Sequence, residues 1–226
     1  MSSSTPSPNI TLYFLQASRS IRVAWLLEEL QLPYKNIFYP RENNKAPAAF
    51  KKESGNALGK APVLKDGEAV VVESGAITEY LIEKYDPNRH LLGGSDPLLR
   101  NRIRSLIHAA EGTFMPHALA VTYARWNATE RMKENGDLQS LEEGLYGNVV
   151  RDLEWLDGEL EGRKFLAGEG LSAADTLCAF SVQFIFARGL GGHIEPGRFK
   201  NADRWLKKCE ETESWKRAVE KTGHQL

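Results

Sequence analysis

The spacing of hydrophobic residues along the first third of the chain changes several times between strand-like and helix-like patterns. Short runs rich in β-branched and aromatic residues are typical of strands, whereas apolar residues spaced three or four apart are typical of helices. In chain order the predicted elements are a strand over residues 9–16, a helix over 20–30, a strand over 34–39, a weakly helical piece over 45–54, a hairpin over 61–73 and a helix over 74–85.

The hairpin has the clearest local signal. Asp66-Gly67 stands between two apolar runs, Ala61–Lys65 and Glu68–Glu73, and suits a two-residue turn with positive φ. Upstream, the order strand, helix, strand predicts a parallel pair joined by a right-handed crossover. The hairpin adds an antiparallel edge to that pair. These elements together predict a small mixed α/β sheet of thioredoxin-like type.

Turn-forming residues separate this region from the rest of the chain. They occur in Asp86–Arg89 and again in Gly93–Pro97, and they indicate a linker. Helical spacing then dominates over residues 100–126, 138–160, 173–188 and 201–209, with a short last helix over 215–221. We therefore expect a disordered tail over residues 1–8, an α/β domain over 9–86, a linker over 87–97 and an all-helical (all-α) domain over 98–226.

Composition and charge exclude several function classes. Of 226 residues 42% are hydrophobic and 26% charged, which is typical of a globular protein, and the net charge of -1 argues against a nucleic-acid partner. No apolar run approaches the ~20 residues that cross a bilayer. The two cysteines, Cys178 and Cys209, are far apart, which argues against a disulfide framework and a cysteine-rich zinc site. A reducing, cytoplasmic setting is expected.

Two predicted helices begin with serine. Ser18-Arg19-Ser20 lies where the first strand gives way to a helix, and Glu73-Ser74 opens the helix after the hairpin. Free N–H groups and the positive end of the helix dipole collect at such places and stabilise carboxylates and thiolates. The same serines also suit ordinary N-caps, which satisfy those N–H groups from within the chain. The residues alone leave both interpretations open.

Two further motifs lie at predicted element boundaries. Ala61-Pro62 precedes a strand, where a trans proline is tolerated, while a cis proline would fix a sharp turn and leave the Ala61 backbone free to hold a peptide ligand. Ser172-Ala173-Ala174-Asp175 has the spacing of a capping box, with aspartate in the third helical position. We interpret this last motif as structural.

Taken in order, these motifs resemble the cytosolic glutathione transferase family, from about Asn9 to Lys221. The ordered set is Ser18–Arg22, Leu58–Leu64, Glu73-Ser74, a linker and Ser172–Asp175. Trp25–Leu30 and Ala110–Gly112 are most similar to a serine-type branch found in fungi and bacteria. The resemblance implies the glutathione transferase fold: a thioredoxin-like, glutathione-binding domain followed by the all-helical domain, assembled as a homodimer.

The resemblance also implies roles for the residues around the sulfur of glutathione. Ser18 stands four residues before Arg22, where serine-type members keep the hydroxyl that contacts this sulfur, and Ser20 is the second candidate. Ala61 would pair its backbone with the cysteinyl part of glutathione, and Pro62 should then be cis. The loop after the first strand has no cysteine, which disfavours the thiol-transferring classes.

The ends of the tripeptide would meet other residues. Ser74, with Glu73 nearby, would hold the γ-glutamyl carboxylate, and Lys45 and Lys60 match positions that approach the glycyl end. Glu111 matches an acidic position near the γ-glutamyl ammonium. The apolar side of the pocket would be lined near three residues of the first long helix of the second domain: Phe114, Met115 and His117.

The function that this resemblance implies is a transferase with glutathione as co-substrate. Its thiolate would attack electrophilic, mostly hydrophobic small molecules, as in detoxification. A glutathione-dependent peroxidase acting on organic hydroperoxides would use the same residues. A binding module without catalytic activity is the third possibility, because the same fold also occurs as an interaction module.

Overall fold

The structure, a computed structural model, describes residues 8–226, which form two compact units. One unit combines the described residues up to Arg89 with Glu211–Leu226, and the other covers His90–Glu210. Of the predicted tail over residues 1–8, only Pro8 lies within the described residues.

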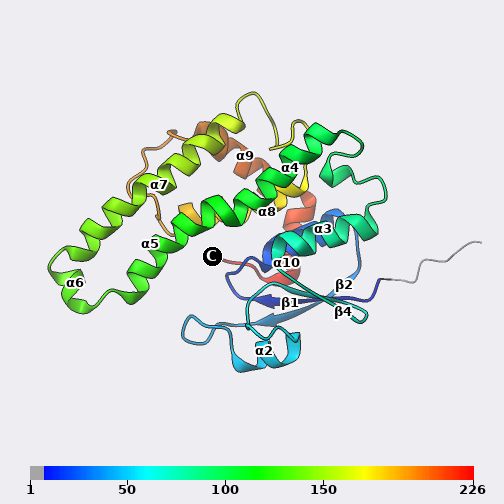
Figure 1. Ribbon diagram of the computed structural model, residues 1–226, viewed down its shortest axis with the longest axis horizontal. Helices are drawn as coiled ribbons and strands as arrows, with labels where there is room; N and C mark the ends of the chain where they lie inside the picture. Colours follow the sequence, from blue (N-terminus) through cyan, green and yellow to red (C-terminus); the bar gives the residue numbers. More distant parts are fainter. Residues whose placement is uncertain (1–7) are drawn as a thin grey trace, which may run out of the picture. The chain divides into compact units, whose positions relative to one another are not determined.

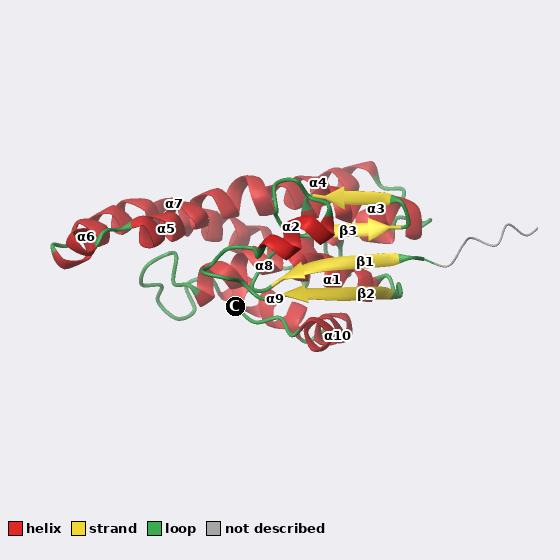
Figure 2. Ribbon diagram, turned by 90° about the horizontal axis from the view of Figure 1, so that it is seen from below, coloured by secondary structure: helices red, strands yellow, loops and turns green. Residues whose placement is uncertain are grey.

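The first unit is built on a mixed four-stranded sheet with helices (Figures 1 and 2). The strands follow the order β2-β1-β3-β4, with β1 and β2 parallel and β3 antiparallel to both β1 and β4. This topology confirms the predicted thioredoxin-like α/β fold. The elements are β1 (Ile10–Leu15), α1 (Ser20–Glu29), β2 (Tyr34–Tyr39), α2 (Ala48–Ser54), β3 (Val63–Asp66), β4 (Ala69–Val72), α3 (Ser74–Tyr85) and α10 (Glu213–Thr222).

The hairpin turn lies one residue later than predicted. Asp66 pairs with Ala69 inside the ladder, so the two turn residues are Gly67 and Glu68 rather than Asp66 and Gly67. Gly67 has φ +59°, which suits glycine in the first central position of a type II′ turn. Asp66 stays in the strand because its carboxylate accepts three hydrogen bonds from α3, donated by Tyr80 (2.8 Å), Lys84 (2.6 Å) and Tyr85 (2.7 Å).

Helix α10 groups with the first unit, although the sequence boundaries assigned residues 211–226 to the helical domain. Trp25 of α1 donates its indole N–H to Ser214 Oγ at 2.9 Å, and its ring meets that of Trp215 edge-on at 5.1 Å. Arg217 forms a 3.0 Å ion pair with Glu28. The helical spacing of this segment marks an apolar face, but it does not identify the helix against which that face packs.

The second unit is all-helical among its described residues, as predicted. Figure 1 shows α5 and α7 side by side, joined through α6. The helices are η1 (His90–Leu92), α4 (Pro97–Ala109), η2 (Ala110–Phe114), α5 (Met115–Asn127), α6 (Glu130–Glu134), α7 (Asp137–Glu159), α8 (Ala173–Ala187) and α9 (Lys200–Glu210). The single helix predicted over residues 100–126 is interrupted at η2, a π-helical turn. Within the described chain, no helix is both long and apolar enough to span a membrane.

The capping box at the start of α8 is confirmed. The Asp175 carboxylate accepts the backbone N–H of Ser172 at 2.8 Å. It also accepts the N–H of Leu166 and the indole N–H of Trp205, each at 2.8 Å, and it is completely buried. This motif therefore organises the core of the second unit.

Candidate functional site

The two serines after β1 lie at the start of α1, with unequal exposure. Ser18 keeps 6% of its surface exposed, and Ser20, the first residue of α1, keeps none. The N-cap residue is Arg19, which makes no side-chain cap to the helix. The first turn of α1 contains no acidic residue. The positive end of this helix therefore faces no carboxylate from its own first turn.

The serine hydroxyls bond to each other and to the end of the strand. Ser18 Oγ donates to the carbonyl oxygen of Leu15 at 2.6 Å and lies 2.9 Å from Ser20 Oγ. The backbone N–H of Ser20 donates to Ser18 Oγ at 3.2 Å, and that of Leu15 donates to Ser20 Oγ at 3.4 Å. These hydrogen bonds hold Ser18 in a defined position at the N-terminus of α1.

The start of α3, like that of α1, has neither a side-chain cap nor an acidic residue in its first turn. Ser74 is its first residue and is buried, and the residue before it, Glu73, has φ +70° and makes no side-chain cap. A positive φ is strained for a residue with a Cβ. Glu73 is exposed, and the first turn of α3 again lacks acidic residues.

Arg22 connects the two helix starts. Its guanidinium is fully buried and donates from Nη1 to Ser74 Oγ at 3.1 Å. The sequence interpretation used Arg22 only as part of a motif and missed this contact. The available signal in the sequence is that Arg22 is the one charged residue in the otherwise apolar run Ile21–Leu27, because a charged side chain in such a run is rarely buried without a partner.

Ala61-Pro62 forms a cis peptide bond, as predicted. Ala61 lies outside strand β3, so its backbone is not part of the ladder. The loop before it is shaped by Asn56, which donates from Nδ2 to the Lys60 carbonyl at 2.8 Å and accepts the Leu58 N–H at 3.0 Å. Lys60 is exposed at the end of this loop.

Lys45 lies on a turn, and not in a helix. Glu42 and Lys45 exchange backbone hydrogen bonds at 3.0 and 2.9 Å across Asn43 and Asn44, which both have positive φ. The prediction of a helical piece from residue 45 is therefore wrong in its first residues, since two asparagines favour a tight turn there and α2 begins at Ala48. The Lys45 side chain is exposed.

The turn that carries Lys45 is tied to the strand that leads to Ser18. Arg41 donates its backbone N–H to Gln16 Oε1 and its Nε–H to the Gln16 carbonyl, each at 2.9 Å. The first unit thus joins Ser18 with Ser20 and Ser74 with Arg22 by direct bonds, and carries Lys45 and Lys60 on exposed turns. Glu111 is half-buried in η2, in the second unit.

The second unit has titratable features of its own. His117 Nδ1 lies 2.7 Å from Asp152 Oδ2, a contact that joins α5 to α7. Burial raises the pKa of Asp152, while the contact with His117 opposes that shift. The rings of Phe114 and Trp155 lie 5.9 Å apart. Across the described residues, no group of three or more histidine, cysteine, aspartate or glutamate side chains could hold a metal ion.

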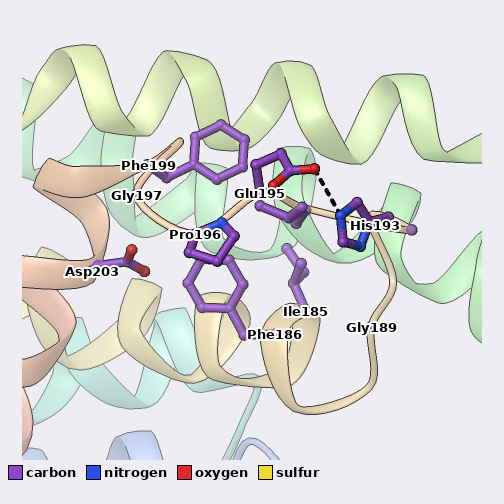
Figure 3. Close-up of a pocket in the computed structure, with 11 residues that line it drawn as sticks. Ile185, Phe186, Gly189, His193, Glu195, Pro196, Gly197, Phe199 and Asp203 are labelled. Atoms are coloured by element: carbon purple, nitrogen blue, oxygen red, sulfur yellow. Dashed lines mark hydrogen bonds and ion pairs between the residues drawn. The ribbon is translucent and has the colours of Figure 1, made fainter.

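A cavity of about 400 Å³ opens in the second unit beside the loop that follows α8 (Figure 3). The loop approaches α7 closely at Gly192, where a Cβ would lie 2.6 Å from the Tyr146 ring. Arg125 anchors the loop by donating to the carbonyl of Gly189 at 3.1 Å. None of the predicted site residues lines this cavity, which is formed by Ile185, Phe186, Gly189, Gly192, His193, Ile194, Glu195, Pro196, Gly197, Phe199 and Asp203.

The fold and these helix starts define a class of protein with a thioredoxin-like α/β unit and an all-helical unit. The family profile described as the glutathione S-transferase N-terminal domain matches residues 8–83, and that of the C-terminal domain matches residues 126–213. The chain therefore belongs to the glutathione S-transferase family.

Individual relatives agree with this assignment. The chain is 29% identical to Glutathione S-transferase 3 of Schizosaccharomyces pombe, over 94% of this chain and 87% of that protein. It is 32% identical to the glutathione S-transferase-like protein OpS6 of Beauveria bassiana, over 68% of each. A solved glutathione S-transferase from Actinobacillus pleuropneumoniae has a TM-score of 0.79 and 26% identity, covering 96% of this chain and 94% of that one.

Proposed function

We propose that the protein is a glutathione transferase of the serine-type branch. In this proposal the first unit binds glutathione, and the bound thiolate attacks the electrophilic carbon of hydrophobic small molecules. The observation that carries the proposal is Ser18, a hydroxyl with residual exposure at a helix start that has no side-chain cap and no acidic residue. A reducing, cytoplasmic setting, which keeps glutathione as the thiol, belongs to the same proposal.

The interactions available at this helix start match what thiolate formation needs. A free thiol with a pKa of ~8.5 is only a few per cent ionised at neutral pH. Lowering that pKa by about two units takes ~2.7 kcal/mol of preferential stabilisation of the thiolate. One hydrogen bond from Ser18 to a charged acceptor contributes ~1.5–3 kcal/mol, and the helix start adds ~0.3–1 kcal/mol.

The rest of the tripeptide is assigned by the chemistry of its groups. The Ala61 backbone, free of the sheet ladder, would pair with the cysteinyl residue beside the cis Pro62. Ser74 Oγ accepts from Arg22, which leaves the Ser74 proton to donate to the γ-glutamyl carboxylate. Glu73 lies next to this helix start, as its N-cap residue with φ +70°.

The remaining parts of the proposal follow from the family resemblance. The exposed Lys45 and Lys60 supply positive charge for the glycyl carboxylate. The role of Glu111 near the γ-glutamyl ammonium stays a prediction. So do the homodimer and the lining of the electrophile pocket by Phe114, Met115 and His117.

The test is the rate of conjugation to an aryl halide for wild-type protein and Ser18→Ala. Loss of the hydroxyl should lower kcat/KM by about ten- to a thousandfold, which corresponds to ~1.4–4 kcal/mol of transition-state stabilisation, while glutathione still binds. Ser105→Ala is the matched control, since that hydroxyl is exposed on α4 and donates only to the Asn101 carbonyl. Wild-type activity in Ser18→Ala would contradict the proposal.

The same preparations separate the peroxidase and binding alternatives. An organic hydroperoxide assayed beside the aryl halide tells which electrophile the thiolate prefers. Glutathione binding without turnover of either substrate would favour a module that binds but does not catalyse.

A further inference from the structure

The hydroxyl proton of Ser20 has one possible acceptor. The side chain is fully buried, and its polar neighbours among the described residues are the Leu15 N–H and Ser18 Oγ. A backbone N–H can only donate, whereas a hydroxyl has one proton and two acceptor positions. The Ser20 proton therefore points to Ser18 Oγ, since the alternative leaves a buried donor unsatisfied.

The donor of Ser20 in turn determines which hydrogen bonds the Ser18 hydroxyl accepts and donates. Its oxygen accepts the Ser20 N–H at 3.2 Å, and the two hydroxyl oxygens lie 2.9 Å apart. With the Ser20 proton directed at Ser18 Oγ, both acceptor positions of Ser18 are filled. Its single proton goes to the Leu15 carbonyl at 2.6 Å. The Ser18 hydroxyl, which is 6% exposed, can therefore interact with a ligand in one way: its proton turns from the Leu15 carbonyl to the ligand.

We infer that Ser20 is a positioning residue that keeps Ser18 as a hydrogen-bond donor to the glutathione sulfur. This inference rests on the proposed function. Because its acceptor positions are occupied, Ser18 cannot take the thiol proton. The S–H bond breaks with its electron pair left on sulfur, the proton passes to solvent water, and Ser18 keeps its own proton while donating it to the thiolate.

The Ser20 hydroxyl also strengthens that donation. A hydroxyl that accepts a hydrogen bond becomes a better donor, because linked hydrogen bonds polarise one another. Removing the Ser20 hydroxyl should therefore raise the pKa of the bound glutathione thiol by about 0.1–0.7, a fraction of the effect of Ser18 itself. Since Ser20 acts only through Ser18, its removal should change nothing once Ser18 is already alanine.

The experiment follows the ultraviolet absorbance of the glutathione thiolate against pH, at saturating glutathione. It compares wild type, Ser18→Ala, Ser20→Ala, the double variant and Ser20→Thr, which restores a hydroxyl. Glutathione affinity and thermal unfolding are measured for each protein, so that only folded, saturated samples are titrated. We expect a small rise in pKa for Ser20→Ala, a large rise for Ser18→Ala, no further rise in the double variant and recovery in Ser20→Thr.

The cycle between the single and double variants separates a positioning role from a structural one. An unshifted pKa in Ser20→Ala, or an equal shift with and without Ser18, would overturn the inference while leaving the proposed function intact. A wild-type protein that fails to bind glutathione, or binds it with the pKa of the free thiol, would instead defeat the proposed function.

Discussion

Among the described residues serine stands at the start of three helices, as the N-cap of α8 and as the first residue of α1 and of α3, and these starts differ in how they are satisfied. At α8, the N-cap Ser172 pairs with Asp175 in the third helical position, and both reciprocal hydrogen bonds of the capping box are present. At α1 and α3 the third helical positions hold Arg22 and Ala76, and neither start has a side-chain cap or an acidic first turn. A serine at a helix start thus has two uses, and the residue at the third helical position separates them.

The difference has an electrostatic meaning. At α8 the protein supplies its own carboxylate to the positive end of the helix, so an external anion finds no role there. At α1 and α3, which belong to one unit and are joined by the Arg22–Ser74 contact, the first turn holds no carboxylate, and the proposed function assigns that place to glutathione. Glutathione carries the two kinds of group that such sites stabilise, a thiolate and a carboxylate.

The largest expected effect on stability comes from removing the carboxylate of the α8 capping box. Asp175→Ala leaves the N–H groups of Leu166, Ser172 and Trp205 without their acceptor in a buried site. It should lower the free energy of unfolding by about 3 kcal/mol or more. Urea denaturation measures this loss, with the exposed Asp137→Ala as control. A loss below about 1 kcal/mol would contradict the structural interpretation of the α8 start.

Low pH should destabilise the first unit through His224. Burial lowers the pKa of His224 from 6.5 to about 4, beside the rings of Phe14 and Trp215. Because the folded protein holds this histidine neutral, its contribution is complete above pH 6.5 and is lost as the pH falls toward 4. The loss should reach about 3 kcal/mol by pH 4.

The measurement is urea denaturation between pH 7 and pH 4, for wild type and His224→Leu. The variant should show the flatter pH dependence, because it removes the group whose protonation favours the unfolded chain. Equal slopes for the two proteins would show that His224 is not the group responsible.

A smaller effect is expected from building the missing carboxylate into α3. Ala76 is exposed at the third helical position, so Ala76→Asp supplies the charge that α8 already has. The helix should gain about 0.5–1 kcal/mol, while glutathione binding should weaken about tenfold because the new carboxylate repels the γ-glutamyl carboxylate. Calorimetric titration with glutathione measures this.

Ala76→Asn is the matched control, since it has nearly the same shape without the charge. Unchanged affinity in Ala76→Asp would mean that the γ-glutamyl carboxylate binds elsewhere. Equal weakening in both variants would mean that size, and not charge, is responsible.

Local signals were enough to predict much of this molecule. Helix α3 runs from Ser74 to Tyr85 as expected, and the capping box is present, whereas the cis Pro62 was expected only from the family resemblance. The first two depend on residues close together in the chain. Capping, turn formation and helical spacing are short-range effects, so they are readable without knowledge of the fold.

What could not be predicted depends on contacts between distant segments. Arg22 meets Ser74 across 52 positions, and Trp25 meets Ser214 across 189. Asp66 reads locally as a turn residue, yet three donors on α3 keep it in its strand. The direction of the hydrogen bond between the Ser18 and Ser20 hydroxyls likewise follows from the burial of Ser20, which the sequence does not display.

The central claim is that the start of α1 turns bound glutathione into a thiolate. The most direct test is the pH titration of the thiolate absorbance for glutathione bound to the wild-type protein. The account predicts a pKa about two units below the ~8.5 of a free thiol. Saturable binding with an unshifted pKa would contradict it, because Ser18 would then be no more than part of a turn.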